Sequence, residues 1–454
     1  MATAIKLEEI TIATTDSGNT VFSVDVCGET PQAIFVTSVS TTTLETKVDD
    51  CHISIGASDG TRHGCVATYE EDNNVNWNTQ GRQSTTEVYM KFDNSATPVI
   101  ETSVSWDGTA AADSFTLQVD DAPPADVFLN VLVFAGFTNA PYLKQYTVTT
   151  GGYSPNQSKT GVGFNPDAGI CFSAGSTSTS SGNTTECKLS YGFAVDNGSE
   201  GSKDQGSHGL YSSESGENAQ TACYLGTSED TCIMLPDSGT GVDFRHGIYT
   251  FDADGFTIYR HNDPGTDRVG WVLCIDEIDA DYSVLTSPTS GTDQKVDTGS
   301  LGFDPHYVGY IGLGFTTDAG TSTHSQLRLG QAFYTGVGPK TTWAYHAVGL
   351  DAATSDAYRH YYDDVLHISN SQYVSDLTDL TEVNWTTTDG YARKMGAFSI
   401  APSASDCDPD DPNAAPAADG QAMASLLMMI GRHTAWMILV YAKKTFDFII
   451  PSIG

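Results

Sequence analysis

The stretch FTIYRHNDPGTDRVGWVLCID (Phe256–Asp276) decides the fold, because the same pattern occurs earlier in the chain. Laid without gaps over FTLQVDDAPPADVFLNVLVFA (Phe115–Ala135), it matches in Phe, Thr, Pro, Asp, Val and Leu, and both copies end in an apolar run. Asp276 then coincides with Ala135, an offset of 141 residues. Self-similarity at a fixed offset is the signature of a repeat architecture. The chain is therefore predicted to contain repeated units, each closed by an apolar β-strand.

A third copy is predicted near the end of the chain. DGQAMASLLMMIGRHTAWMILVY (Asp419–Tyr441) aligns without gaps with Asp254–Asp276, so that the Asp-Gly pairs coincide and Trp436 falls on Trp271. We expect the closing strands of the three copies to superpose. These predicted strands are Leu129–Phe134, Val272–Ile275 and Met437–Tyr441.

The apolar run near the carboxyl terminus also raises the question of a membrane anchor. Met423–Ala442 has the roughly 20 residues that a spanning helix needs, but Arg432 and His433 lie in its middle. An Arg at that depth costs about 2.5–3.5 kcal/mol even on insertion-based scales. A closing β-strand is the preferred interpretation, and no membrane insertion is expected.

A second landmark supports the triplication. A proline followed by an apolar strand occurs in TPQAIFVTS (Thr30–Ser38), NPDAGICFS (Asn165–Ser173) and DPHYVGYIG (Asp304–Gly312). About twenty residues further on, three strands align with one another, and a glycine recurs in register in each. These strands are DCHISIGAS, ECKLSYGFA and HSQLRLGQA, with Gly56, Gly192 and Gly330.

The predicted fold is all-β, with three tandem β-sandwich domains of jelly-roll or lectin-like type at residues 1–140, 141–284 and 285–454. The many short strands separated by turn residues favour a sandwich, and a closed barrel is the alternative. Strict alternation marks half-exposed strands, whereas unbroken apolar runs such as WMILV mark strands buried on both faces. The third domain carries an acidic insertion and a carboxyl-terminal tail.

Charge and cysteine usage limit the function. The 454 residues include 21 Lys and Arg against 57 Asp and Glu, a formal net charge of −36, which disfavours nucleic-acid binding. The amino terminus has no apolar core of signal-peptide length, so no secretion is expected. Nine cysteines without CxxC spacing indicate neither a disulfide framework nor a zinc site, and most are expected to be reduced.

One acidic segment resembles a calcium loop in its first residues only. In DCDPDDPNAAPAADG (Asp406–Gly420), alternate aspartates match the first ligands of an EF-hand. The sixth position is Asp411 instead of glycine, and the twelfth is Ala417 instead of glutamate. A solvated loop is preferred, so no cofactor or metal is predicted, and calcium is kept as the alternative.

No catalytic residues are predicted. The sequence lacks GxSxG, a Walker loop and HExxH, and paired carboxylates carry little information in so acidic a chain. The segment YRHYYDDVLH (Tyr358–His367) contains His360, Asp363, Asp364 and His367. We expect these to be surface polar residues and not a metal or acid–base site. Trp77 and Trp385, each in a polar VNW context, are the candidates for contact with a glycan.

The repeated motifs resemble a loosely defined group of bacteriophage virion proteins. The resemblance lies in GFNPDA (Gly163–Ala168), GFDP (Gly302–Pro305) and DGFT (Asp254–Thr257), and is best in the middle unit. The first unit lacks the Gly-Phe pair, and Gln421–Ala422 replace Phe-Thr in the third. The resemblance implies a non-catalytic structural protein of a tail appendage or capsid surface, located in the virion and assembled in the host cytoplasm.

Two functions therefore remain open. The first is a virion structural protein that contacts other virion proteins and copies of itself. The alternative is a carbohydrate-binding or carbohydrate-cleaving protein that acts at a cell surface. Apolar residues that have no counterpart in the first two copies are expected to be covered by a partner or a neighbouring unit. They are Leu426, Leu427, Met428, Met429, Ile430, Phe446, Phe448, Ile449 and Ile450.

Overall fold

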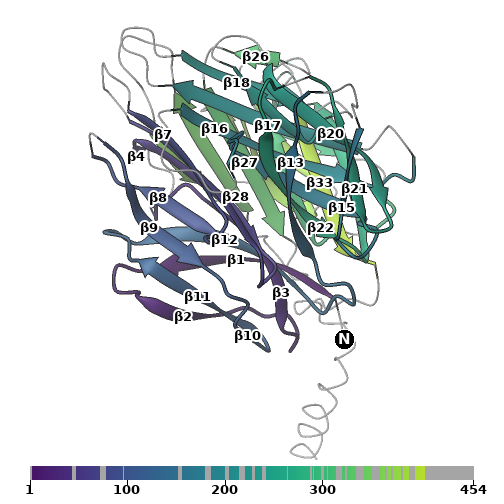
Figure 1. Cartoon of the computed structure of the whole chain (residues 1–454), viewed down its shortest axis with the longest axis horizontal. Coiled ribbons are helices and arrows are strands. Elements are labelled where there is room, and N and C mark those ends of the chain that lie inside the picture. Colours follow the sequence, from purple (N-terminus) through teal and green to yellow (C-terminus); the bar gives the residue numbers. More distant parts are fainter. Residues whose placement is uncertain are drawn as a thin grey trace, which may run out of the picture.

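The computed structural model describes residues 3–403, in which every regular element is a β-strand (Figure 1). The gaps are 43–47, 72–77, 96, 152–155, 179–185, 200–203, 214–219, 227–230, 238–241, 263, 287–288, 290, 298–300, 304, 313–319, 323–324, 334–341, 350–357, 363–365, 370–371, 380–381 and 388–393. Strands within 220–226, 291–297 and 320–387 are described by their pairing alone. The predicted all-β class is confirmed, with six antiparallel sheets in the described residues.

The first third of the chain forms a large and a small sheet. In order, the first large sheet is β1 (Ala4–Ile12), β12 (Val127–Ala135), β3 (Pro31–Ser38), β5 (Cys51–Ser58), β6 (His63–Glu70) and β7 (Thr79–Ser84). The first small sheet is β10 (Ala110–Ala111), β11 (Ser114–Asp121), β9 (Ile100–Ser105) and β8 (Tyr89–Phe92), with β2 (Gly18–Ser23) also paired to β11.

The middle third forms a second pair of sheets. The second large sheet is β13 (Tyr142–Val148), β22 (Arg268–Ile275), β15 (Ala168–Ser173), β16 (Glu186–Val195), β17 (Asp204–Ser213), β18 (Gln220–Gly226) and β26 (Gly320–Ser322). The second small sheet is β14 (Asn156–Thr160), β21 (Gly255–Arg260), β20 (Val242–Asp252) and β19 (Ile233–Pro236).

The last described third forms the third pair. The third large sheet is β23 (Ile278–Thr286), β33 (Lys394–Pro402), β25 (Tyr307–Gly312), β27 (Ser325–Phe333), β28 (Thr342–Gly349), β29 (Tyr358–Tyr362) and β4 (Val48–Asp49). The third small sheet is β24 (Gly291–Asp297), β32 (Glu382–Thr387), β31 (Gln372–Asp379) and β30 (Leu366–Ser369).

The three large sheets share one strand order. In each, the first strand pairs with the last strand of its third of the chain, which pairs with the strand that follows the proline, and three more strands follow in sequence. Two short strands cross between sheets, because β4 comes from the first third but pairs with β29, and β26 comes from the last third but pairs with β18. The large sheets are thus linked by pairing as well as by packing.

Strand register agrees with the predicted position of the recurring glycines. Gly56 pairs with Val36, Gly192 with Cys171 and Gly330 with Tyr310. A Cβ atom on Gly56 would lie 2.1 Å from the carbonyl oxygen of Val88, and one on Gly192 would lie 2.3 Å from that of Cys232. Glycine is needed at both places because the chain leading into the small sheet passes directly over the strand.

The closing strands agree with the prediction in two of three cases. β12 and β22 contain Leu129–Phe134 and Val272–Ile275 and occupy the same place in their sheets. In the third large sheet this place is taken by β33, so the prediction that Met437–Tyr441 would fill it was wrong. Met437–Tyr441 itself lies outside the described residues. β33 escapes detection because Ala397 and Ser399 give it no continuous run of large apolar residues.

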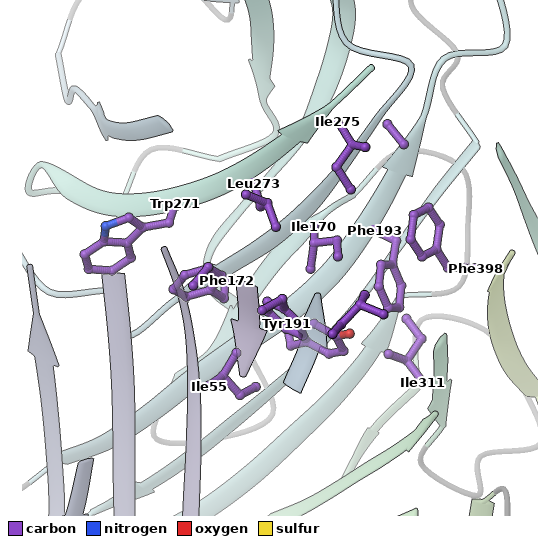
Figure 2. Packing of buried hydrophobic residues seen from close by; sticks show 14 of the residues in the cluster. Ile55, Ile170, Phe172, Tyr191, Phe193, Trp271, Leu273, Ile275, Ile311 and Phe398 are labelled. Carbon is purple, nitrogen blue, oxygen red and sulfur yellow. The ribbon is translucent and has the colours of Figure 1, made fainter. Parts of the chain in front are cut away.

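The large sheets are buried on both faces, as expected for unbroken apolar strands. On β12, Val131 and Val133 face a core shared with the first small sheet, whereas Leu132 and Phe134 face a second core. β22 alternates in the same way between a core shared with the second small sheet and the second core. This second core, which we call the central core, contains residues of all three large sheets (Figure 2).

An aromatic row joins the three large sheets through the central core. Phe35 of β3 stacks on Tyr191 of β16 with ring centroids 5.7 Å apart, and Tyr191 meets Phe193 edge-on at 4.9 Å. Phe193 then stacks on Phe398 of β33 at 4.3 Å, as Figure 2 shows. Aromatic pairs at such distances add to the stabilisation from apolar burial. The central core therefore holds distant parts of the chain together.

Candidate functional site

Most residues that the sequence analysis proposed for contacts lie outside the described residues. This applies to the apolar residues of 426–430 and 446–450, to Trp77 and to the acidic segment Asp406–Gly420. Trp385 lies on β32, where it pairs with Gln294 and Val374, but its side chain is not described. The glycan and partner assignments of these residues stay predictions.

The histidine-rich segment is divided between two sheets. His360 lies on β29 of the third large sheet, directly opposite His346 of β28. His367 lies on β30 of the third small sheet and pairs with Tyr373. The segment therefore does not form one strand, and its two histidines belong to different sheets.

A buried cysteine and histidine cluster occupies the core between the second large and small sheets. Tyr146 Oη lies 2.8 Å from Nε2 of His246, and Cys232 Sγ lies 3.8 Å from Nδ1 of the same ring. Burial raises the pKa of Cys171. Burial also acts to raise the pKa of Cys232, but hydrogen bonding to Cys171 and the neighbouring His246 outweigh this effect and lower the pKa of Cys232 to about 6. None of these side chains is more than 4% exposed, so the cluster faces packed side chains instead of a substrate.

Cysteine pairing differs from the sequence-based expectation at one position. Cys27 is disulfide-bonded, although the spacing of the nine cysteines indicated no disulfide framework. Six other cysteines of the described part are free and buried, in line with their expected role as small apolar residues.

A cavity of about 200 Å³ lies where the first and second large sheets meet. We call it the Arg82 pocket. Its walls come from β7, from the turn after β15, from the start of β16 and from the start of β22. The lining residues are Gly81, Arg82, Ala174, Gly175, Ser176, Thr177, Glu186, Lys188 and Arg268.

One wall of the Arg82 pocket is an ion-pair network that joins the second large sheet to the second small sheet. Arg268 donates to Asp243 Oδ2 at 2.9 Å and to the carbonyl oxygen of Gly175 at 2.7 Å. Lys188 lies 3.4 Å from the same Asp243 oxygen and 3.0 Å from Glu186 Oε2. The network fixes the positions of two cations and orders the turn that carries Ser176 and Thr177.

The opposite wall carries Arg82, which is not neutralised. Its Nε is buried and has no hydrogen-bond partner, and it forms no ion pair with any residue in the described part of the chain. The Nε of Arg268 is likewise buried without a partner. Guanidinium groups stay charged at all physiological pH values and present donors that match an oxyanion. The pocket therefore combines unused donors with positive charge.

The residues of the Arg82 pocket share no pattern in the sequence. Arg82, Lys188 and Arg268 belong to no motif and are far apart in the chain, and only the packing of β7 against β16 brings them together. The sequence contains no signal for the site, although three of only 21 Lys and Arg line this single pocket.

Comparison with protein-family models and with curated protein sequences gives no match. Among the described residues, no helix is long and apolar enough to cross a membrane. In the same part of the chain, no group of three or more His, Cys, Asp or Glu side chains is arranged to hold a metal ion.

Proposed function

We propose that the protein is a non-catalytic structural component of a bacteriophage virion, built as three β-sandwich repeats around a local pseudo-threefold axis. The observation that carries this proposal is the common strand order of three large sheets that enclose one core. Symmetric particles need components that present equivalent surfaces to several neighbours, and a fused triplet supplies them in one polypeptide.

Equivalent hydrogen bonds support the repeat. Ser38 Oγ donates to the carbonyl oxygen of Phe128 at 2.6 Å, and Ser173 Oγ donates to that of Val269 at 2.7 Å. Phe128 and Val269 differ by the offset of 141 residues that aligned the two closing strands in sequence. A serine hydroxyl thus makes the same hydrogen bond to the closing strand in the first and second large sheets.

A second pair of equivalent bonds ties each large sheet to its small sheet. Ser54 Oγ accepts from the backbone amide of Met90 at 3.2 Å, and Ser190 Oγ accepts from that of Met234 at 2.8 Å. Each serine is two residues before the recurring glycine, Gly56 or Gly192. Matching hydrogen bonds of this kind are expected of duplicated sandwiches and not of sheets that are alike by chance.

Contacts between the large sheets follow a cyclic pattern. β6 contacts β16, β17 contacts β27 and β28 contacts β5, and these are the same two strand positions in each case. The turn after β15 contacts β7 through a hydrogen bond that Gln83 donates to the carbonyl oxygen of Ser178. At the equivalent edges of the other two large sheets, β26 pairs with β18 and β4 pairs with β29. Each unit therefore contributes a segment to the edge of the preceding one, and the first contributes to the third, which supports closed pseudo-threefold symmetry.

The virion assignment rests on the resemblance of the GF-x-P and DGFT motifs, and the partners it implies are other virion proteins and copies of this chain. The repeat boundaries that the sheets favour are near 138 and 277, where β13 and β23 follow, instead of near 140 and 284. The carboxyl-terminal residues after β33 are then additional to the third repeat, and we propose that they make the contact with a partner.

Truncation tests the proposed contact. A chain that ends after Lys444 lacks Phe446, Phe448, Ile449 and Ile450, and we expect it to fold but to enter particles or oligomers less than the full chain. The measurement is the amount of each chain in purified particles, with a chain carrying four exposed-loop alanines as control. Equal incorporation of the truncated and full chains would rule out the tail as the contact.

A further inference from the structure

We propose that the Arg82 pocket binds the oxyanion group of a small polar ligand, a carboxylate or a phosphate. This site lies between the first and second large sheets and does not depend on the virion role. Its volume of about 200 Å³ is below the roughly 300–1,000 Å³ of pockets for drug-sized molecules, which fits a ligand no larger than about one sugar residue.

The charge balance of the pocket favours an anion. Three cations, Arg82, Lys188 and Arg268, stand against two carboxylates, Glu186 and Asp243. Both carboxylates are already within ion-pair distance of Lys188, and Asp243 also accepts from Arg268. The remaining positive charge is that of Arg82, in a chain whose formal net charge is −36. A single negative charge on a ligand would balance it.

The available donors also fit an oxyanion. Arg82 and Arg268 each have a buried Nε without a partner, and a guanidinium binds the two oxygens of a carboxylate or phosphate side by side. The hydroxyl groups of Ser176 and Thr177 line the same cavity and suit the ligand's remaining polar atoms.

The pocket is not a requirement of the repeated fold. Strand register shows that Arg82 corresponds to Tyr224. Arg82 pairs with Ala67, and Ala67 pairs with Ser54. In the same way, Tyr224 pairs with Gly209, and Gly209 pairs with Ser190. Lys188 likewise corresponds to His52, since each lies two residues before its matching serine. The framework recurs without these cations, so the basic residues serve this one junction.

Isothermal titration calorimetry on the full chain tests the site with three probes: sodium glucuronate, inorganic phosphate and neutral glucose. We expect saturable binding of at least one anion and at least tenfold weaker binding of glucose. Preference for glucuronate assigns the pocket to a carboxylate, and preference for phosphate assigns it to a phosphorylated ligand. Absence of binding by both anions would overturn the proposal.

Two variants place the binding in this pocket. Arg82→Gln is expected to weaken anion binding at least tenfold, whereas Arg260→Gln, which removes an equal charge from a half-buried position on β21 outside the pocket, is expected to leave it unchanged. Should Arg82→Gln fail to fold, Thr177→Glu keeps the test open, because it adds a carboxylate at an exposed lining position where it can occupy the site. Anion binding that survives Thr177→Glu would contradict the proposal.

Discussion

Asp167 and Asp276 lie close together at the junction between the successive thirds of the chain. The backbone amide of Ile278 donates to Asp167, and Asn139 donates to Asp276 Oδ2 at 2.8 Å. Burial raises the pKa of Asp167 to about 6, and the neighbouring carboxylate of Asp276 contributes in the same direction. The two carboxyl groups therefore lie where the connection between the first and middle thirds meets the connection between the middle and last thirds.

Asp167 makes stability depend on pH. The folded chain holds this proton to a higher pH than the unfolded chain, so the contribution is complete below the ordinary pKa of 3.8 and is lost as pH rises through about 6. We expect Asp167→Asn to abolish this dependence and, at pH 8, to raise the free energy of unfolding by about 1 kcal/mol, a value reduced because the group is only half buried.

Urea unfolding between pH 4 and pH 8 provides the measurement. Asp120→Asn, a change in an exposed carboxylate of the first small sheet, is the control and is expected to preserve the pH dependence of the wild-type chain. An Asp167→Asn variant with the same pH dependence as wild type would exclude this carboxyl as the source.

Gly64 lies at a close contact between the first and second large sheets. A Cβ atom at this position would lie 2.5 Å from Cδ1 of Trp271, whose ring stacks on Phe172 with centroids 5.5 Å apart. Overpacking of a close contact costs typically about 1–3 kcal/mol. We expect Gly64→Ala to destabilise by this amount in the wild-type chain and by much less when Trp271 is also replaced by alanine.

A double-mutant cycle measured by urea unfolding checks this coupling. Trp271→Ala alone is expected to cost about 3–5 kcal/mol, as for other buried aromatic residues. An equal cost of Gly64→Ala with and without Trp271 would show that the two sheets do not pack as described.

At the scale of the elements, the alternation of apolar side chains decides which strands can be detected from sequence. The two closing strands β12 and β22 were found because large side chains occupy both of their faces. In β33, Ala397 is small and is opposite Tyr310, a large residue, whereas the corresponding pair in the first large sheet is Val131 and Val36. Exchange of volume between paired strands preserves the core while removing the sequence signal.

The pocket could not be predicted for a different reason. Its residues come from strands whose order in the sheets was not known, and a charged side chain at one strand position has no period of its own. The fold class, the Pro-containing strands and the recurring glycines are local patterns, so they could be recognised. The junction of two sheets depends on contacts between residues far apart in sequence.

The repeated serine bonds allow a test at this scale. Ser38→Ala and Ser173→Ala each remove the hydroxyl donor from a carbonyl oxygen at a buried or partly buried position, so each is expected to cost about 1–3 kcal/mol. Because the two serines have equivalent partners, the costs are expected to be similar. Ser158→Ala, on an exposed edge of the second small sheet, serves as control and is expected to change stability by less than about 0.5 kcal/mol. Urea unfolding in which only one core serine matters would contradict their equivalence.

At the scale of the whole molecule, the proposed three repeats would give one chain the form of three associated copies of a single-sandwich protein. The central core takes the place of a subunit interface, and the exchanged strands β4 and β26 take the place of arms that reach a neighbouring subunit. Under this proposal the three fused units are free to diverge, which fits a basic pocket at one junction and Tyr224 at the corresponding position of the next proposed repeat.

Cryo-electron microscopy of virus particles purified from host cells that produce this chain tests the central claim most directly. The account predicts ordered density at regular positions of the particle, in which each copy shows three β-sandwich lobes around a local threefold axis. Absence of the chain from the particles would contradict the structural role. Three lobes arranged in a line, without a shared core, would contradict the pseudo-threefold architecture.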